Sequence, residues 1–384
     1  MRVMVAPGAF KGSLSALEAA RAMEAGVLRA VPGCRVVRVP LADGGEGTVT
    51  TLVASVGGQM VAREVTGPLG TKVQAYLGLL TGTGTGVVEA AQAAGLTLVP
   101  PGRANPMRTT SYGVGELMRM ALDAGCGRLV VGLGDSGTVD GGLGALQALG
   151  ARFLDGRGEL LKAGGGELAR LRSLDLSGLD PRLARTQIVL AVDVDNPLLG
   201  PRGAARAFGP QKGATPGQVE ELERGLAELA RVIEAQTGRK VGDLPGGGAA
   251  GGLGAGLAGV LGAQVRSGAD LVLEATDLGR RLGGVDLVLT GEGRLDSQTL
   301  RGKVVLGVAA RARRAGVPVV AVVGSLGEDA APPAEYGLDA VFSACPGPVP
   351  LAQAMEHARE LLAGAVEQVM RVLALGRRLG QPRT

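Results

Sequence analysis

The chain of 384 residues is long enough for two domains, and 46% of its residues are hydrophobic, which is enough to build a core in each. A single histidine excludes mechanisms and metal sites that need two imidazoles, and three dispersed cysteines without a C-x-x-C pair exclude zinc-ribbon and thioredoxin-type chemistry. A net charge of only +4, with scattered basic residues and 2% aromatic residues, argues against nucleic acid as the main partner.

Short apolar runs alternate with longer amphipathic stretches along the chain. Most of the runs are continuously apolar, as expected of strands that are covered on both faces. Strands are predicted at 2–6, 35–39, 73–80, 86–90, 129–133, 188–192, 285–289, 318–323 and 340–343. Helices are predicted at 13–31, 45–55, 112–124, 216–235, 300–315 and 351–375, the last with His357 in its middle. This order predicts an α/β protein with largely parallel sheets.

Two segments are candidate domain boundaries. Residues 66–70 are rich in turn-forming residues, and residues 276–284 are charged. If both are boundaries, residues 1–66 and 280–384 form one domain from the two chain ends, and residues 67–279 form an inserted α/β domain.

Nothing in the composition predicts a membrane protein. Residues 244–265 carry no charge, but nine of these 22 residues are Gly, which favours a buried helix start over a membrane span. The sparse cysteines and the lack of a recognisable secretory signal predict a cytoplasmic protein.

Two polar, Gly-rich segments near the N-terminus are candidates for ligand binding. The first runs from a predicted strand into a helix start at Ser13, where backbone amides and Lys11 would attract an anion; an ordinary strand-to-helix turn is the alternative. The second places Asp43 and Glu46 among three Gly, so the two carboxylates could hold a cation or face one side of a helix start. A turn Asp and a dipole-favoured Glu are the alternative there.

Two further segments follow predicted strands in the middle of the chain. Residues 132–142 combine Gly137, Thr138 and two Asp, as a phosphate or ribose cradle would. Asp193 and Asp195 lie two residues apart at the end of an apolar run, a spacing that puts both carboxylates on one strand face and suits a divalent metal. Lys212 lies in a second Gly-rich stretch, residues 208–215.

The fifth segment has the highest density of polar residues. It begins with Gly291 after the predicted strand 285–289 and brings Glu292, Arg294 and Asp296 into six residues, with Lys303 shortly after. A structural loop rarely needs so many polar groups, so this segment favours function. All five segments stand beside strand ends or helix starts, where ligands bind in open α/β sheets.

Together these segments resemble the type I glycerate kinase family. The similar motifs are Phe10-Lys11-Gly12-Ser13-Leu14-Ser15 and residues 42–48, 110–113, 193–198, 208–215, 251–256, 290–299 and 302–303, and the resemblance covers nearly the whole chain. The resemblance implies phosphorylation of glycerate, usually at the 2-hydroxyl, with ATP and Mg²⁺. It also implies two dissimilar α/β domains, one of them flavodoxin-like and formed by both termini, with the active site in the cleft between them.

The chain departs from the family pattern at two places. Relatives usually have Pro-Asp-Ser-Phe-Lys-Gly-Ser in the first loop, where this chain has Pro7-Gly8-Ala9-Phe10. Relatives usually have Asn where this chain has Val139 in the third loop. Asp43 or Asp140 could take the role of the Asp that is missing from the first loop.

The roles that follow are hypotheses. Lys11, Asp43, Arg294 and Asp296 are the predicted catalytic residues, with Lys11 neutralising phosphate or carboxylate charge, Arg294 as the alternative carboxylate clamp and Asp43 as the base. The predicted metal ligands are Asp193, Asp195 and Glu292, with Asp296 as a further candidate. The predicted nucleotide-binding residues are Ser13, Gly137, Thr138, Lys212, Gly291 and Lys303.

Two other readings stay open. A dinucleotide-dependent oxidoreductase would fit the α/β order, but the chain lacks G-x-G-x-x-G at its first helix. A non-catalytic protein that binds a hydroxy acid or a nucleotide is the second alternative, favoured by the altered first loop. The expected partner is a small molecule, glycerate, without nucleic acid or membrane, and a homodimer is the assembly to test.

Overall fold

The computed structural model describes residues 1–297, 299–301 and 304–379, and it divides into two compact units. Unit 1 comprises Met1–Asp43 and Ala269–Thr384, and unit 2 comprises Gly44–Gly268. Both are α/β, one with a parallel and one with a mixed sheet, which confirms the predicted fold class. No helix in the described part of the chain is both long enough and apolar enough to cross a membrane.

Unit 1 is built on a five-stranded parallel sheet in the order β15-β13-β11-β1-β2. Its strands are β1 (Arg2–Val5), β2 (Arg35–Arg38), β11 (Leu287–Thr290), β13 (Val319–Val323) and β15 (Ala340–Ser343), and β12 (Arg294–Leu295) and β14 (Ser325–Leu326) form a separate short pair. Counted along the unit, the spatial order is 2-1-3-4-5, which is the flavodoxin-like order. The order reverses between β1 and β11, and the carboxyl ends of these two strands are therefore the expected ligand edge.

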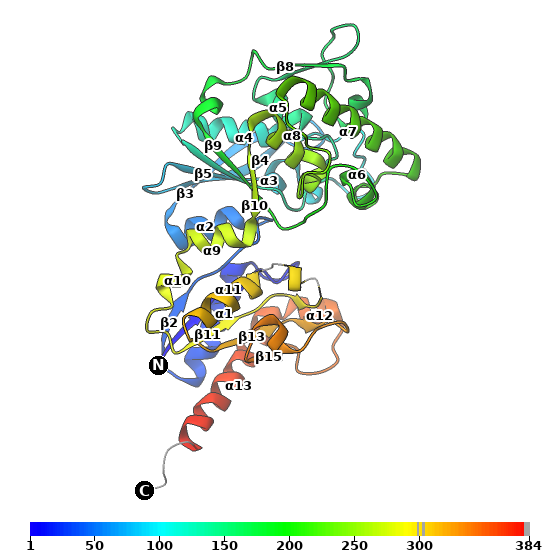
Figure 1. Cartoon of the computed structure of the whole chain (residues 1–384). Helices are drawn as coiled ribbons and strands as arrows, with labels where there is room; N and C mark the ends of the chain where they lie inside the picture. The colour runs from blue at the N-terminus through cyan, green and yellow to red at the C-terminus, as the bar shows by residue number, and fades with distance from the viewer. Residues whose placement is uncertain (298, 302–303, 380–384) are drawn as a thin grey trace. The chain divides into compact units, whose positions relative to one another are not determined.

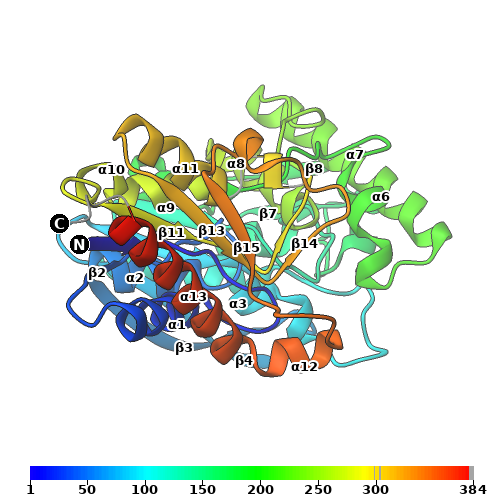
Figure 2. The ribbon, with the colours of Figure 1, turned by 90° about the horizontal axis from the view of Figure 1, so that it is seen from below.

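Helices cover both faces of this sheet. α1 (Ala16–Ala30) and α13 (Ala358–Leu379) lie side by side against one face, where they share a core with β1, β11 and β13 (Figures 1 and 2). On the other face of the sheet, α11 (Val304–Arg314) packs against β11 and β13. The buried strand residues on this face alternate with those that face α1 and α13. The remaining helices of the unit are α9 (Gly268–Ala275), α10 (Leu278–Arg281) and α12 (Leu351–Glu356).

Unit 2 contains a six-stranded mixed sheet in the order β10-β9-β6-β5-β4-β3. β10 (Gln264–Ser267), β9 (Gln187–Val192), β6 (Arg128–Gly132) and β5 (Thr85–Glu89) pair in parallel, whereas β4 (Lys72–Leu80) pairs antiparallel with both β5 and β3 (Gly58–Thr66). A second, two-stranded sheet pairs β7 (Arg152–Leu154) with β8 (Ser173–Asp175). The helices are α2 (Thr48–Val56), α3 (Ala90–Ala94), α4 (Tyr112–Asp123), α5 (Leu143–Ala148), α6 (Ala204–Phe208), α7 (Pro216–Thr237) and α8 (Leu253–Leu261).

The chain passes from unit 1 to unit 2 after residue 43 and returns to unit 1 after residue 268. The sequence analysis predicted these boundaries after residues 66 and 279. The segment 44–66 lies in unit 2 because β3 pairs with β4 along its whole length, from Gly58–Leu80 to Thr66–Lys72. At the other end, Asp270 forms an ion pair with Arg311 of α11 (Nη2 to Oδ1, 3.3 Å), and α9 thereby belongs with unit 1.

Several local predictions can be compared with the structure. Thr215 caps α7 in a capping box with Gln218, and Pro216 follows at the first helical position, where the sequence analysis predicted the helix to begin. The first helix begins later than predicted: its cap is Ser15, in a capping box with Glu18. The predicted last helix is two helices, because His357 leaves the helical conformation between α12 and α13. Its expected place in the middle of a helix was therefore wrong.

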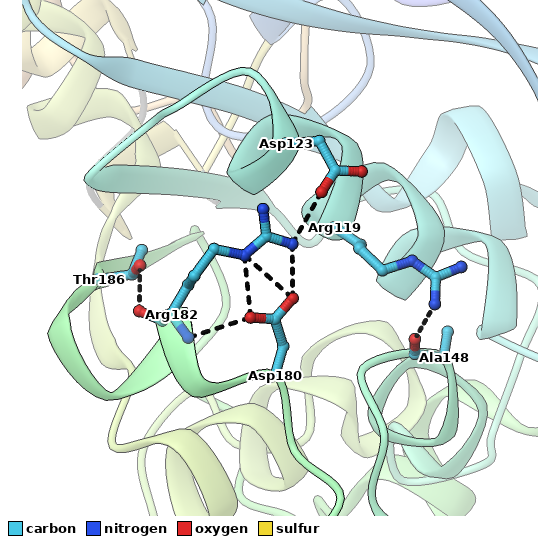
Figure 3. Close-up of polar contacts among 6 residues, drawn as sticks. All are labelled: Arg119, Asp123, Ala148, Asp180, Arg182 and Thr186. Carbon is cyan, nitrogen blue, oxygen red and sulfur yellow. Dashed lines mark hydrogen bonds and ion pairs between the residues drawn. The ribbon is translucent and has the colours of Figure 1, made fainter.

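A polar network holds the turn before β9 against α4 (Figure 3). Asp180 caps the turn by accepting from the backbone N–H of Arg182, and its carboxylate pairs with the Arg182 guanidinium (Nη2 to Oδ2, 2.6 Å). The same Nη2 reaches Asp123 of α4 at 2.7 Å, and Arg119 of α4 donates to the carbonyl of Ala148. The guanidinium of Arg182 lowers the pKa of Asp180. This network is structural and lies within unit 2.

Candidate functional site

The first and fifth polar loops lie side by side at the switch point of unit 1. Gly8 N–H donates to Gly291 O (2.9 Å), and Thr290 Oγ1 donates to Ala6 O (2.8 Å). A Cβ at position 293 would lie 3.2 Å from Lys11 N, so only Gly permits this approach without adjustment. Lys11 and Arg294, from segments almost 300 residues apart, therefore belong to one edge of the sheet.

The first loop closes on itself before the helix begins. Phe10 is buried and exchanges backbone hydrogen bonds with Leu14, and Ser13 Oγ donates to Phe10 O (2.9 Å). Because Ser15 and Glu18 cap α1 reciprocally, the amides at its start are partly satisfied by the protein itself. Ser13 was expected at the helix start and instead lies in the preceding turn.

The fifth loop is held by several hydrogen bonds between its own residues. Thr299 Oγ1 donates to Glu292 Oε1 (2.7 Å), and Arg294 Nε lies 3.4 Å from Asp296 Oδ2. Gly291 packs so closely that a Cβ there would lie 1.9 Å from Val322 O. The predicted role of Lys303 falls on a residue outside the described part of the chain. The geometry brings Glu292, Arg294 and Asp296 together.

In unit 2 the second, third and fourth loops meet at the carboxyl ends of β6 and β9. A Cβ at Gly44 would lie 2.9 Å from Ala191 O in β9, and one at Gly132 would lie 2.3 Å from Gly44 O. A Cβ at Gly134 would come within 2.5 Å of the Gly45 Cα. These contacts fix the chain that directly follows Asp43 against the strand that leads into Asp193.

Glu89, at the end of β5, is a buried carboxylate that the sequence analysis did not select. Only 1% of it is exposed, and it accepts from the backbone N–H groups of Gly47 (3.2 Å) and Val49 at the start of α2. Burial raises the pKa of Glu89, while these N–H donors oppose the rise. The signal was present: an ionisable residue ends an otherwise apolar strand.

Asp140 holds the third loop from inside. It is fully buried, and its Oδ2 accepts from Ser111 N (2.8 Å), Ser111 Oγ (2.8 Å) and Gly144 N (3.3 Å), while Oδ1 accepts from Gly142 N (3.1 Å). Burial raises the pKa of Asp140 against the effect of these donors. Because its carboxylate is enclosed by the protein, Asp140 is badly placed to replace the Asp that is missing at Gly8. A Cβ at position 8 would make only ordinary contacts at 3.7 Å, so packing does not explain that Gly.

Lys212 is buried beneath the same loop. It is 3% exposed, and its Nζ donates to Ser136 Oγ and to Thr138 O, both at 2.9 Å. Burial lowers the pKa of Lys212 to about 7, and the charge of Asp140 partly offsets this shift. Lys212 thus contacts the backbone and hydroxyl of the loop that contains Gly137 and Thr138, all three of which were predicted to bind nucleotide.

The predicted metal ligands come from both units, and the two in unit 2 lie in one exposed segment. Asp193 and Asp195 are exposed after β9, and Asp195 forms an ion pair with Arg202. Glu292 belongs to unit 1 and accepts from Thr299. Within residues 1–297, 299–301 and 304–379, no group of three or more His, Cys, Asp or Glu side chains could hold a metal ion.

Each unit thus presents polar loops at the carboxyl edge of its sheet. Unit 1 gathers Lys11 and Arg294, whose positive charges suit anion binding, together with the carboxylates of Glu292 and Asp296. Unit 2 gathers Glu89, Asp140 and Lys212 as buried supports of its loops, with Asp193 and Asp195 exposed. Asp43 is the last residue of unit 1 and directly precedes the segment that packs on β6 and β9.

Comparison with known proteins gives matches along nearly the whole chain. The sequence profile of the Glycerate kinase family matches residues 3–374. A Bacillus subtilis (strain 168) protein named glycerate kinase is 48% identical over 94% of this chain and 95% of its own, and an Escherichia coli (strain K12) protein named glycerate 2-kinase is 44% identical over 98% and 99%. A crystal structure from Salmonella typhimurium LT2, of a protein named glycerate kinase 2, superposes with a TM-score of 0.88, at 46% identity and 98% and 99% coverage.

Proposed function

Because this chain belongs to the glycerate kinase family, we propose that it transfers the γ-phosphoryl group of ATP to a hydroxyl group of glycerate. The observation that carries the proposal is identity of 44–48% to named glycerate kinases over essentially the full length of both chains. The 2-hydroxyl is the proposed acceptor, on the name of the E. coli relative. The comparisons give no support to a non-catalytic binding protein.

The chemistry suits the residues that the loops contain. Phosphoryl transfer depends on positioning and on neutralising charge, and it needs no covalent protein intermediate. Lys11 would neutralise charge on phosphate or on the glycerate carboxylate, and Arg294 is the alternative clamp because its planar fork binds both carboxylate oxygens. Asp43 would accept the proton of the glycerate hydroxyl, and Asp296 is a further proposed catalytic residue that would hold Mg²⁺ directly or through water.

Magnesium is the proposed metal. Asp193 and Asp195 are exposed carboxylates in the segment that follows β9, and Mg²⁺ prefers oxygen donors of this kind; Glu292 is the third proposed ligand. When bound, Mg²⁺ neutralises phosphate charge and fixes its orientation. The nucleotide would contact Ser13, the loop with Gly137 and Thr138, Gly291 and Lys303, while Lys212 would act through the loop that it supports.

Location and assembly are proposals as well. None of the three cysteines is in a disulfide, which is compatible with a reducing cytoplasm. A homodimer is proposed as the assembly and is tested by analytical ultracentrifugation, where a monomer mass at working concentration would reject it.

The test is an ADP-release assay against a panel of hydroxy acids, with the product position read by ³¹P NMR. We expect glycerate-dependent ADP release and a 2-phosphoglycerate signal. Folded protein that binds ATP but releases no ADP with glycerate would reject the proposed activity, and a 3-phosphoglycerate signal would reject only the acceptor position.

The metal assignment is tested by Asp193→Asn, with Asp123→Asn as a control carboxylate on the surface of the same unit. Asp193→Asn should abolish turnover and remove its dependence on Mg²⁺, whereas the control should leave both unchanged. Near-normal kcat in Asp193→Asn would reject Asp193 as a ligand.

A further inference from the structure

Tyr336 lies buried beneath the fifth loop of unit 1. It ends the short 3₁₀ helix Pro333–Tyr336, is 1% exposed and is among the largest fully buried side chains of the described residues. Its hydroxyl donates to the carbonyl of Asp296 (3.0 Å) and accepts from the backbone N–H of Ala331 (2.9 Å). A single hydroxyl thus links two loops that are 35 residues apart.

The same two loops are tied together at other points. Gly327 N–H donates to Leu295 O (2.8 Å), in register with the β12–β14 pair, and Ser297 Oγ donates to Asp329. A Cβ at position 327 would lie 2.7 Å from the Asp296 Cβ and 3.4 Å from Arg294 Nη2. Arg294 and Asp296 therefore lie on a loop that is held both by the hydroxyl of Tyr336 and by hydrogen bonds to residues 327 and 329.

The hydrogen bonds of the Tyr336 hydroxyl explain why a polar group is buried here. A hydroxyl without partners would cost free energy in an apolar interior, and a Phe would fill the same volume without that cost. Here both bonds of the hydroxyl go to the backbone of loops and neither goes to an element of the core. The hydroxyl therefore fixes loop position, and packing alone would not need it.

We propose that Tyr336 is a positioning residue that holds the loop of Arg294 and Asp296 in the geometry needed for phosphoryl transfer. The proposal rests on the proposed kinase function. It places no part of Tyr336 on the substrate: the residue acts through the carbonyl of Asp296.

The test compares Tyr336→Phe with Tyr76→Phe, a control on β4 that is 41% exposed. Tyr336→Phe should lower kcat about tenfold at 25 °C, the effect of one lost hydrogen bond of ordinary strength on a reacting geometry, with no loss in the control. It should also speed amide hydrogen exchange in residues 294–297 and 329–331. Unchanged kcat with a lowered Tm would show a purely structural role and overturn the proposal.

A second variant guards against misfolding of the first. Ser297→Ala removes the lateral tie to Asp329 without touching the buried ring, and it should lower kcat in the same direction by a smaller factor. If neither variant changes kcat, the proposal is wrong. If wild-type protein does not phosphorylate glycerate at all, the proposed function fails, while unchanged exchange in Tyr336→Phe would still reject the positioning role.

Discussion

The two units differ in whether charged residues are buried beneath the loops at the carboxyl edge of the sheet. At the edge of unit 1, Lys11 and Arg294 are exposed, and the loops are held mainly by backbone contacts and by Tyr336. In unit 2, Asp140 and Lys212 are buried inside the structure that supports the loops. A buried charge must be compensated by hydrogen bonds, so it fixes what it bonds to, whereas an exposed charge stays available to a ligand.

Lys11 and Lys212 show the difference most directly. Both precede Gly in a Gly-rich stretch, and the sequence treats them alike. In the structure one is exposed beside a helix start and the other is almost fully buried with two hydrogen bonds. Similar local motifs therefore leave the amine exposed in one unit and bury it beneath a loop in the other.

The largest effect is expected from Asp140→Asn. In either orientation of the new side chain, its amide nitrogen faces at least one backbone N–H that now donates a hydrogen bond to the carboxylate. These donors are the N–H groups of Ser111, Gly142 and Gly144. We expect a loss of about 3 kcal/mol in the free energy of unfolding. Urea unfolding measures it, and a loss below about 1 kcal/mol would contradict the view that this carboxylate holds the loop.

Lys11→Met should separate activity from stability. If Lys11 meets transferring charge, kcat should fall on the order of 10²-fold, as when one electrostatic donor is removed from an active site. Because the side chain is exposed, the unfolding free energy should hardly change. Changed stability with normal kcat would instead favour the plain turn that the sequence left open.

Lys212→Met should change how the stability of the protein depends on pH, because the amine of Lys212 is buried. The pKa of Lys212 is lowered to about 7 by burial, so between pH 7 and about 10.5 the unfolded chain binds a proton that the folded chain does not. Wild-type stability relative to the variant should therefore rise with pH in this window, by at most about 1.4 kcal/mol per unit, and should be constant below it. A flat difference across pH 7–9.5 would show that the amine is not desolvated.

The smallest effect is expected from Asp123→Asn at the surface of unit 2 (Figure 3). Its carboxylate is 61% exposed, and its partner Arg182 keeps Asp180 as a second acceptor. The expected change in unfolding free energy is within about 0.5 kcal/mol, with kcat unchanged. A loss above about 1.5 kcal/mol would mean that exposed ion pairs also stabilise unit 2, and burial of charged residues would then not be what distinguishes it from unit 1.

Local patterns predicted much of the fold. Continuous apolar runs gave the strands of the parallel region, including β6, β9, β11 and β13, because strands covered on both faces need apolar residues at every position. β3 was missed because it is an edge strand that buries only Val65 fully and shows no apolar run. The break at His357 was missed because neither Gly nor Pro marks it.

The sequence by itself determined the family, the α/β class and which loops contain many polar and charged residues. These features follow from residue order and from the short-range spacing of apolar and polar groups. Tertiary structure alone decided that the loops after β1 and β11 share an edge, that Glu89 and Lys212 are enclosed, and that Tyr336 reaches Asp296. These features depend on contacts between residues tens to hundreds of positions apart, and burial, which sets the cost and the role of each charge, exists only once those distant segments have packed together.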